Sequence, residues 1–537
     1  MPARVSSRGA RTSDVLVIGA GHNGLVCAWY LAARGMKVTM LERRHVVGGA
    51  AVTEEFHPGF RNSTASYTVS LLNPRVIEDM RLHAHGLKVV LRKIDNFLPT
   101  LGPGYLLSGR GGLTRREIAR HSPADAAGYD AYLAALEPVV AILKQWILRA
   151  PPNAGGGVSD VMAALKLGND VRGLDAEARR NLLDFFTRPA ADILGRYFET
   201  DIVKALFGFD SVVGNYASPY DPGSAYVLLH HLFGEAAGVA GAWGHAIGGM
   251  GAITQAMARA CREKGVEILL DSPVEEIVVE RGRAVGAVAG GKVHRAGAVA
   301  ANVDPRRLFA SLIPDGAVAP QTARRMAGWS AESATFRMNL ALSELPRFTS
   351  LPEPGDHLTA GIIVAPSLDY MDRAYTSART EGWAREPIVE MLIPSTLDDS
   401  LAPPGAHVAS LFCQHFPYEV KGGWEERVDE AADHILAHVD RYAPGFKASV
   451  VGRLALSPWH LEQRFGIPRG DIFHGKMGLD QLFSARPLLG HADYRMPLPG
   501  LYLCGSGAHP GGGVTGAPGH NAAKAILADR RRIRRSA

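Results

Sequence analysis

The sequence predicts an α/β protein of more than one domain, on three observations. The chain has 537 residues, which is too long for one ordinary hydrophobic core. Residues 14–44 follow the pattern strand, tight turn, helix, strand, with a β-branched apolar run at 15–18, and this is typical of a buried parallel strand pair joined by a helix. Residues 120–235 have mostly helical apolar spacing, whereas residues 266–302 form short strands separated by glycine-containing turns. Helical and strand-rich regions therefore accompany the first unit.

Positive charge is concentrated at the two ends of the chain. Hydrophobic residues make up 47% and charged residues 21%, which is the balance of a globular protein. The net charge of the whole chain is only +5. The terminal arginines carry more positive charge than this, so the residues between the two ends are nearly neutral. A nucleic-acid partner is not expected, because no basic stripe remains on the body. We expect residues 1–13 and 529–537 to be disordered basic tails; their arginines are Arg4, Arg8, Arg11, Arg530, Arg531, Arg532, Arg534 and Arg535.

The cysteines and the hydropathy pattern limit the cell compartment. Cys27, Cys261, Cys413 and Cys504 are far apart and form no CxxC pair, which argues against a dithiol redox centre and a secreted disulfide scaffold. No uninterrupted apolar run reaches the roughly 18 residues that span a bilayer, and the first residues lack a signal-peptide core. We expect a protein of the cytoplasm or an organellar matrix, at most peripheral to a membrane and not secreted. No Cys/His cluster or HExxH motif predicts a metal.

The motif "GAGHNG" directly follows the first predicted strand. It places Gly19, Gly21 and Gly24 in the spacing GxGxxG. The first glycine permits a tight turn, the second lets backbone approach a pyrophosphate, and the third lets the helix pack on the sheet. We therefore predict a Rossmann-like dinucleotide-binding unit.

The residues around this motif complete the prediction. The free N–H groups at the start of the helix, near His22 and Asn23, are expected to face phosphate charge. Glu42 ends the second predicted strand, where its carboxylate can accept hydrogen bonds from a ribose.

The next segment, "RRHVVGGAAVT", bears on which dinucleotide is bound. It resembles the second phosphate-approach motif of the flavin amine oxidase and carotenoid desaturase superfamily, in which the cofactor is FAD. Gly48 and Gly49, followed by Ala50, supply backbone that can lie against the pyrophosphate and ribityl chain. Arg43 can offer charge to the phosphate, whereas Arg44 is as readily a solvated side chain.

Further segments make the resemblance more specific. They are "STASYTVSLLNP", "GSAYVLLHHLFGE", "GAWGHAIGGMGAITQAMA", "GDIFHGKMGLDQLFSARPLLG" and "LYLCGSGAHPGGGVTGAPGHNAA". Together they resemble the phytoene-dehydrogenase-related flavoprotein family over residues 14–528. The resemblance implies a discontinuous Rossmann-like FAD-binding domain with an inserted mixed α+β substrate domain and a helical lid. The FAD domain would comprise residues 14–80, 240–305 and 482–528, and the substrate domain residues 81–239 and 306–481.

The same resemblance assigns roles to residues near the flavin. The backbone of Val274 is expected to contact adenine. The glycine-rich loop at 505–516 is expected to wrap around the ribityl chain and the isoalloxazine ring, with backbone N–H groups stabilising the reduced flavin. His509 in this loop is the side-chain candidate for proton transfer or flavin contact, and the alternative is a histidine that bonds loop backbone. The loop residues expected at the cofactor are Gly505, Ser506, Gly512, Gly513 and Val514.

The function implied is an FAD-dependent oxidoreductase acting on a lipophilic, isoprenoid or polyene-like substrate by hydride transfer at flavin N5. The outcome would be desaturation, saturation or isomerisation of a C–C bond. Two alternatives stay open: an amine or amino-acid oxidase, many of which have a catalytic lysine by N5, and an interaction protein that binds FAD without turnover. Residues 139–148 either skim a membrane or form a core or lid helix. Ser63, Ser66 and Tyr67 either line the flavin cavity or only pack, and His230 and His231 are expected to pack.

Overall fold

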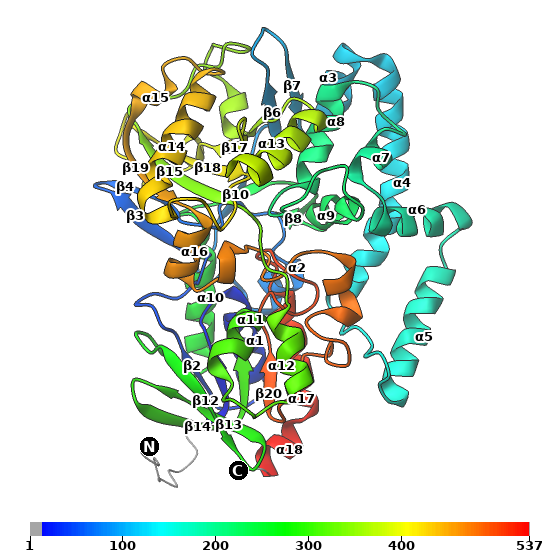
Figure 1. The fold of residues 1–537 in the computed structure, drawn as a ribbon, viewed down its shortest axis with the longest axis vertical. Coiled ribbons are helices and arrows are strands. Elements are labelled where there is room, and N and C mark those ends of the chain that lie inside the picture. The colour runs from blue at the N-terminus through cyan, green and yellow to red at the C-terminus, as the bar shows by residue number, and fades with distance from the viewer. Residues whose placement is uncertain (1–12, 536–537) are drawn as a thin grey trace.

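The computed structural model describes residues 13–535, and Figure 1 shows its two main sheets. The predictions for residues 1–12, 536 and 537 lie outside the described residues. One sheet lies in the lower half of Figure 1 and is parallel at its centre. Its parallel strands, in spatial order, are β11 (Glu267–Leu269), β2 (Val38–Leu41), β1 (Ser13–Ile18), β14 (Lys292–Ala301) and β20 (Leu501–Leu503).

Strand β14 joins this parallel sheet to an antiparallel meander. Its first residues pair with β13 (Arg283–Ala289), which pairs in turn with β12 (Val274–Glu280). Its last residues pair with β1 and β20. The short strands predicted for residues 266–302 are thereby confirmed.

Three helices pack together beside the parallel sheet: α1 (His22–Ala32), α10 (Met250–Glu263) and α17 (Ala517–Ala528). Helix α1 contacts both of the others. The contact with α17 is very close, because a Cβ atom on Gly519 would lie 2.1 Å from the Asn23 carbonyl oxygen. The first turn of α1 and helix α17 can therefore pack this closely because residue 519 is a glycine.

The C-terminal tail differs from the expectation of disorder. Helix α18 (Arg530–Arg535) continues from α17, and Ile533 is buried. Asp529 accepts hydrogen bonds from Arg495 at 2.7 Å and from Tyr502 at 2.8 Å. These contacts anchor the segment, so its basic composition alone was a poor guide.

The second sheet forms the upper half of the molecule (Figure 1). All neighbouring strands are antiparallel except β16 and β6. Helices α13 (Leu368–Glu381) and α14 (Trp424–Asp440) pack beside it. Its strands in order are β19 (Val450–Leu456), β15 (Phe336–Leu342), β18 (His407–Gln414), β17 (Ile388–Leu392), β16 (Gly361–Val364), β6 (Asn96–Pro99) and β7 (Tyr105–Ser108).

A helical region lies beside the second sheet. Helix α4 is long and apolar enough to cross a membrane by length and composition alone, unlike anything expected from the sequence. However, Val139, Leu143 and Trp146 on α4 are buried in a shared core, so residues 139–148 belong to a packed helix. The helices of this region are α3 (Leu113–His121), α4 (Pro123–Ile147), α5 (Val158–Arg172), α6 (Ala176–Thr187), α7 (Ala190–Leu194), α8 (Asp201–Gly208) and α9 (Ser224–His231).

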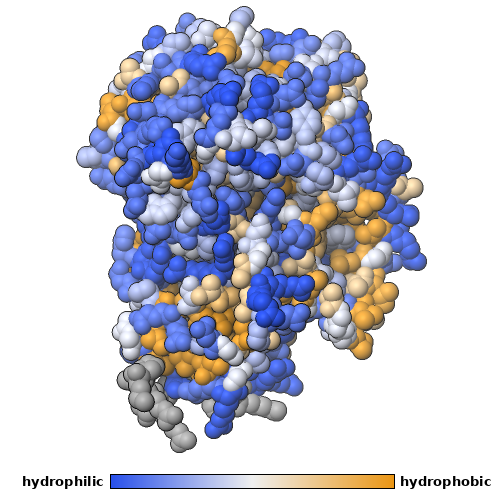
Figure 2. Space-filling view, in the orientation of Figure 1, coloured by the Kyte–Doolittle hydropathy of each residue, from blue (hydrophilic) through white to orange (hydrophobic). Residues whose placement is uncertain are grey.

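Helix α5 stands away from the body (Figure 1), and none of its residues is buried. Val158, Val161, Met162 and Leu165 are exposed apolar residues on it, and hydrophobic surface is visible in this part of Figure 2. The remaining α-helices and β-strands of four residues or more are β3 (Thr53–His57), β4 (Phe60–Ser63), α2 (Pro74–Asp79), α12 (Pro320–Ala327), α15 (Phe446–Ser449) and α16 (Pro458–Phe465), with shorter strands, turns, a π-helix and 3-10 helices between them.

The close contact between α1 and α17 gives a stability test. We expect Gly519→Ala to lower the free energy of unfolding by about 1–3 kcal/mol, because the new methyl group must displace the Asn23 backbone. Gly168→Ala on α5 is the matched control, since no atom lies within 4 Å of its Cβ position. The control should be neutral or stabilising by up to about 1 kcal/mol. Thermal denaturation of both variants measures the difference; equal melting temperatures would contradict the proposed contact.

Candidate active site

The turn between β1 and α1 is closed by the end of β14. Gly19 has φ +90°, and a Cβ atom there would lie 2.8 Å from the Asn302 carbonyl oxygen. The Asn302 side chain donates from Nδ2 to the Gly19 carbonyl at 3.2 Å. Gly21 precedes α1, and no side chain caps the helix. The unpaired N–H groups of its first turn are therefore available to an anionic ligand.

A cavity opens at this helix N-terminus, and its empty volume of about 950 Å³ includes space open to solvent. It runs from the carboxyl ends of β1 and β2 toward Val274 at the start of β12. The carboxyl edge of a parallel sheet is where such folds hold nucleotides. Ten residues expected at the cofactor line it, namely Gly19, Gly21, His22, Glu42, Arg43, Gly48, Gly49, Ala50, Val274 and Ser506.

Glu42 forms part of the cavity wall as a buried carboxylate. Its Oε2 accepts from the Ala20 N–H at 2.7 Å, and its Oε1 accepts from the Arg44 N–H at 2.9 Å. Each carboxylate oxygen has a further lone pair for a ribose hydroxyl. The two backbone bonds hold the carboxylate in one orientation, which suits the predicted role.

Two arginines add positive charge to this cavity. Arg43 lines it and donates to the Arg464 carbonyl, and Arg307 lines it as well. Burial lowers the pKa of Arg43, and the nearby charge of Arg307 lowers it further. A phosphate would relieve that repulsion. Arg44 also lines the cavity, but it forms an ion pair with Glu54 at 2.6 Å and is not simply solvated.

A second cavity adjoins the first, and its empty volume of about 1280 Å³ includes space open to solvent. Apolar side chains such as Leu71, Val213 and Ile253 line much of it, together with the loop residues Gly513 and Val514. Ser66 and Tyr67 line it too, so these two residues do face a cavity. The residues that line both cavities, and hence mark their junction, are His22, Ala50, Ile467, His474 and Ser506.

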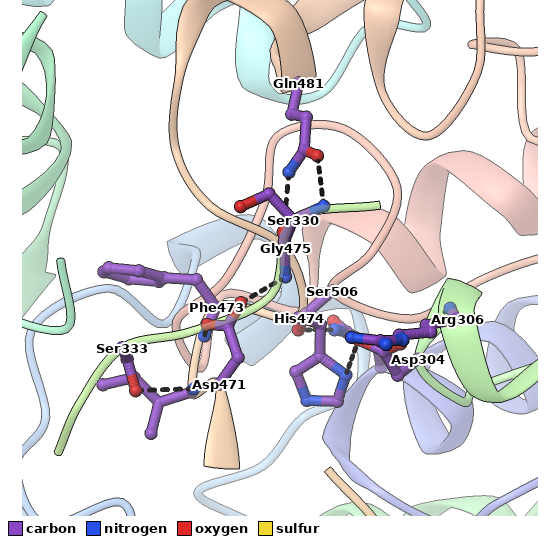
Figure 3. A network of polar contacts seen from close by, with 12 residues as sticks. Asp304, Arg306, Ser330, Ser333, Asp471, Phe473, His474, Gly475, Gln481 and Ser506 are labelled. Atoms are coloured by element: carbon purple, nitrogen blue, oxygen red, sulfur yellow. Dashed lines mark hydrogen bonds and ion pairs between the residues drawn. The ribbon is translucent and has the colours of Figure 1, made fainter. Parts of the chain in front are cut away.

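A buried polar network supports the junction (Figure 3). Asp471 accepts from the N–H groups of Phe473 and Gly475, both at 2.9 Å, and so shapes the turn that carries His474. Figure 3 shows His474 beside Asp304, with 3.9 Å between Nδ1 and Oδ2. Arg486 donates to the carbonyl groups of this turn, including that of Phe473 at 2.8 Å.

Burial governs the protonation of this network. It lowers the pKa of His474 to about 3, so this imidazole is neutral at pH 7. Burial raises the pKa of Asp304 to about 7 and that of Asp471 to about 6. Asp304 Oδ2 and His474 Nδ1 have no hydrogen-bond partner within the described chain. Unpaired buried polar atoms at the junction fit a site that binds a polar cofactor group.

Other residues of the glycine motifs lie behind the cavity walls. A Cβ atom on Gly24 would lie 2.2 Å from the Gly19 carbonyl oxygen, and one on Gly512 would lie 2.4 Å from Phe473. Gly505 packs on Asn302 in the same way, at 3.0 Å. Asn23 donates to Ser506 Oγ at 3.1 Å. These four predicted residues, Asn23, Gly24, Gly505 and Gly512, thus shape the walls without lining either cavity.

His509 is placed differently from the predicted flavin contact. It is buried, its Nε2 bonds the Trp146 carbonyl at 3.2 Å, and its ring packs on Phe483. It lines neither cavity. The structure therefore favours the alternative role, a histidine that bonds backbone. His230 is similar, since its Nε2 bonds the Gly512 carbonyl at 3.1 Å.

Two histidines, His22 and His474, line both cavities, and sequence reasoning missed the second. His474 lies in the quoted segment "GDIFHGKMG", so the motif carried the signal, but nothing in the motif ranked it above the other histidines. Asp304, Arg337 and Glu390 were missed as well, because their burial cannot be read from the sequence around them.

Comparison with known proteins agrees with this geometry. The family model for flavin-containing amine oxidoreductases matches residues 24–335. The rat pyridine nucleotide-disulfide oxidoreductase domain-containing protein 2 is 40% identical, over 96% of this chain and 93% of that protein. The lycopene-forming phytoene desaturase of Pseudescherichia vulneris is 25% identical, over 93% and 96%.

A solved structure shows the same fold. Cyclohexylamine oxidase from Brevibacterium oxydans has a TM-score of 0.57 at 16% identity, covering 97% of this chain and 99% of that one. The predicted Rossmann-like α/β fold is thereby confirmed. The matched family and the fit of the nucleotide cavity also bear out FAD as the cofactor. The chain belongs to the flavin-containing amine oxidoreductase family, as an FAD-dependent oxidoreductase related to the phytoene desaturases.

Proposed function

We propose that this flavoprotein acts on a lipophilic substrate, of the isoprenoid or polyene kind, by desaturation, saturation or isomerisation of a C–C bond. The observation that carries the proposal is the large second cavity, which is mostly apolar and adjoins the nucleotide cavity at His474 and Ser506. Apolar walls favour an apolar substrate by burial. The name of the phytoene desaturase relative supports the same substrate class.

The described residues have distinct roles in this proposal. FAD, when bound, supplies hydride transfer at N5. The N–H groups of α1 and the Arg43 side chain would hold the pyrophosphate, and Glu42 would hold the ribose. Gly513 and Val514 place backbone against the second cavity, where N–H groups can stabilise negative charge on the reduced ring. The apolar walls orient the substrate and exclude water.

An amine or amino-acid oxidase is the second candidate, because the matched family and the solved neighbour carry amine oxidase names. Among the described residues that line the two cavities there is no lysine. That departs from the lysine expected near N5 in many such enzymes. An FAD-binding interaction protein, contact with a membrane and the cell compartment stay predictions.

The substrate class can be tested with the purified holoprotein. We expect anaerobic mixing with an isoprenoid polyene to change the redox state of the flavin, seen as loss or return of its visible absorbance. Primary amines and amino acids of similar size should leave the spectrum unchanged, because the walls offer apolar contacts. Reduction by amines alone would favour the second candidate, and a flavin unresponsive to every compound would favour the interaction protein.

The cofactor site has a separate test. We expect Gly21→Val to abolish FAD retention, because its Cβ atom would lie 2.9 Å from Asn302 Nδ2 and would also block the approach of phosphate to backbone. Gly168→Ala serves again as the glycine control, and the flavin-to-protein absorbance ratio is the measurement. Full FAD content in Gly21→Val would contradict the phosphate-binding role of the turn.

The two buried histidines provide a matched comparison. We expect His474→Ala to keep FAD but to slow flavin reduction by about tenfold or more, because His474 lines both cavities. His509→Ala should lower the melting temperature and leave the rate within about threefold, because His509 only bonds the Trp146 backbone. Stopped-flow absorbance measures both rates. The reverse order of effects would return His509 to the active site.

A further inference from the structure

One wall of the second cavity carries a buried arginine with unused donors. Arg337 on β15 lines the cavity and is only 1% exposed. Its Nη2 donates to Ser410 Oγ at 2.6 Å, whereas its Nε and Nη1 have no partner in the described chain. Its guanidinium carbon lies 4.3 Å from the centre of the Tyr67 ring. An arginine this deeply buried is costly unless its N–H groups are paired.

A second arginine lies close behind the same wall. Arg92 is 2% exposed, and its Nη2 donates to Thr68 Oγ1. Its guanidinium faces the Trp243 ring at 5.6 Å, and its Nη1 has no partner in the described chain. Thr68 and Trp243 both line the cavity, so the charge of Arg92 also acts there.

The nearby acids leave an excess of positive charge. Glu390 is buried, and it accepts a hydrogen bond from the Tyr67 hydroxyl rather than from either arginine. Burial raises the pKa of Asp210, which also lines the cavity, to about 8, so it is mostly uncharged at pH 7. The carboxyl group of Asp95 lies near Arg92, but it interacts with the charge of Arg110 as well. Burial raises the pKa of Glu390 as well, so the two guanidinium groups outweigh the negative charge beside them where dielectric screening is weak.

We propose that this wall binds the carboxylate of the substrate, with Arg337 as its main partner. The proposal rests on the proposed function and narrows it from a lipophilic compound to an apolar acid, such as an isoprenoid or fatty carboxylic acid. The unpaired Nε and Nη1 of Arg337 lie on different edges of the guanidinium, so a carboxylate would accept a charge-assisted hydrogen bond from one of them. A bound anion would offset this excess of positive charge.

The rest of the cavity suits the apolar part of such an acid. Val213, Ile253, Phe412 and Leu461 are among its lining residues. With the carboxylate at Arg337, the length of the substrate's apolar chain determines which part of the substrate lies near Gly513 and Val514. The bond that reacts would then be chosen by its distance from the acid group.

The test uses the wild-type holoprotein and three matched ligands: farnesoic acid, its methyl ester and farnesol. Titrations follow the change in flavin absorbance on binding. We expect the acid to bind at least about tenfold more tightly than the ester or the alcohol, because only the acid forms charge-assisted hydrogen bonds. Equal affinities, or tighter binding of the ester, would overturn the proposal.

Variants locate the site. Arg337→Met should remove the preference for the acid and leave the ester affinity within about twofold, whereas Arg337→Lys should keep part of the preference. Arg469→Met is the charge-matched control, because Arg469 pairs with Glu419 and Glu332 and lines neither cavity. A preference that survives in a folded Arg337→Met would overturn the proposal. FAD content and melting temperature report folding; if Arg337→Met does not fold, the wild-type ligand series and Arg337→Lys decide.

These outcomes separate the inference from the function on which it rests. A flavin that reacts with neutral polyenes and shows no preference for acids would overturn only the carboxylate site. A flavin that responds to no lipophilic compound, acidic or neutral, would overturn the proposed function as well.

Discussion

The close approach of three distant segments at the carboxyl edge of the parallel sheet supports the rest of the site. The turn at Gly19, the end of β14 at Asn302 and the loop at Gly505 pack with almost no space between them. Backbone can come this close only where side chains are absent. The free end of α1, the Glu42 carboxylate and the loop that carries Gly513 are all positioned by this contact.

Buried charge distinguishes the two cavities from ordinary core. At the junction, Asp471 and Arg486 hold the turn that carries His474 through hydrogen bonds to its backbone N–H and carbonyl groups. At the wall of the second cavity, Arg337 retains unpaired donors. Since unpaired buried donors cost stability, their presence in a cavity is better explained by ligand binding than by folding.

Much of the nucleotide site was predictable because its chemistry is local. Gly19, Gly21 and Glu42 lie within one strand-turn-helix-strand unit, so their spacing alone implied their geometry. His474 and Arg337 could not be found this way. Each reaches its cavity through packing between segments hundreds of residues apart, and one buried histidine looks like another in sequence. His509 illustrates this limit of the sequence. It lies in the most distinctive motif, yet its side chain bonds the Trp146 backbone.

The sequence by itself determined the Rossmann-like unit, the cofactor class and the family, because glycine spacing and strand pattern act over short distances. Only the tertiary structure decided which polar residues face the cavities. It also turned residues 530–535 into helix α18 and packed one face of residues 139–148 into a core. The physical reason is that burial and hydrogen-bond pairing depend on neighbours from the whole chain, and composition does not record them.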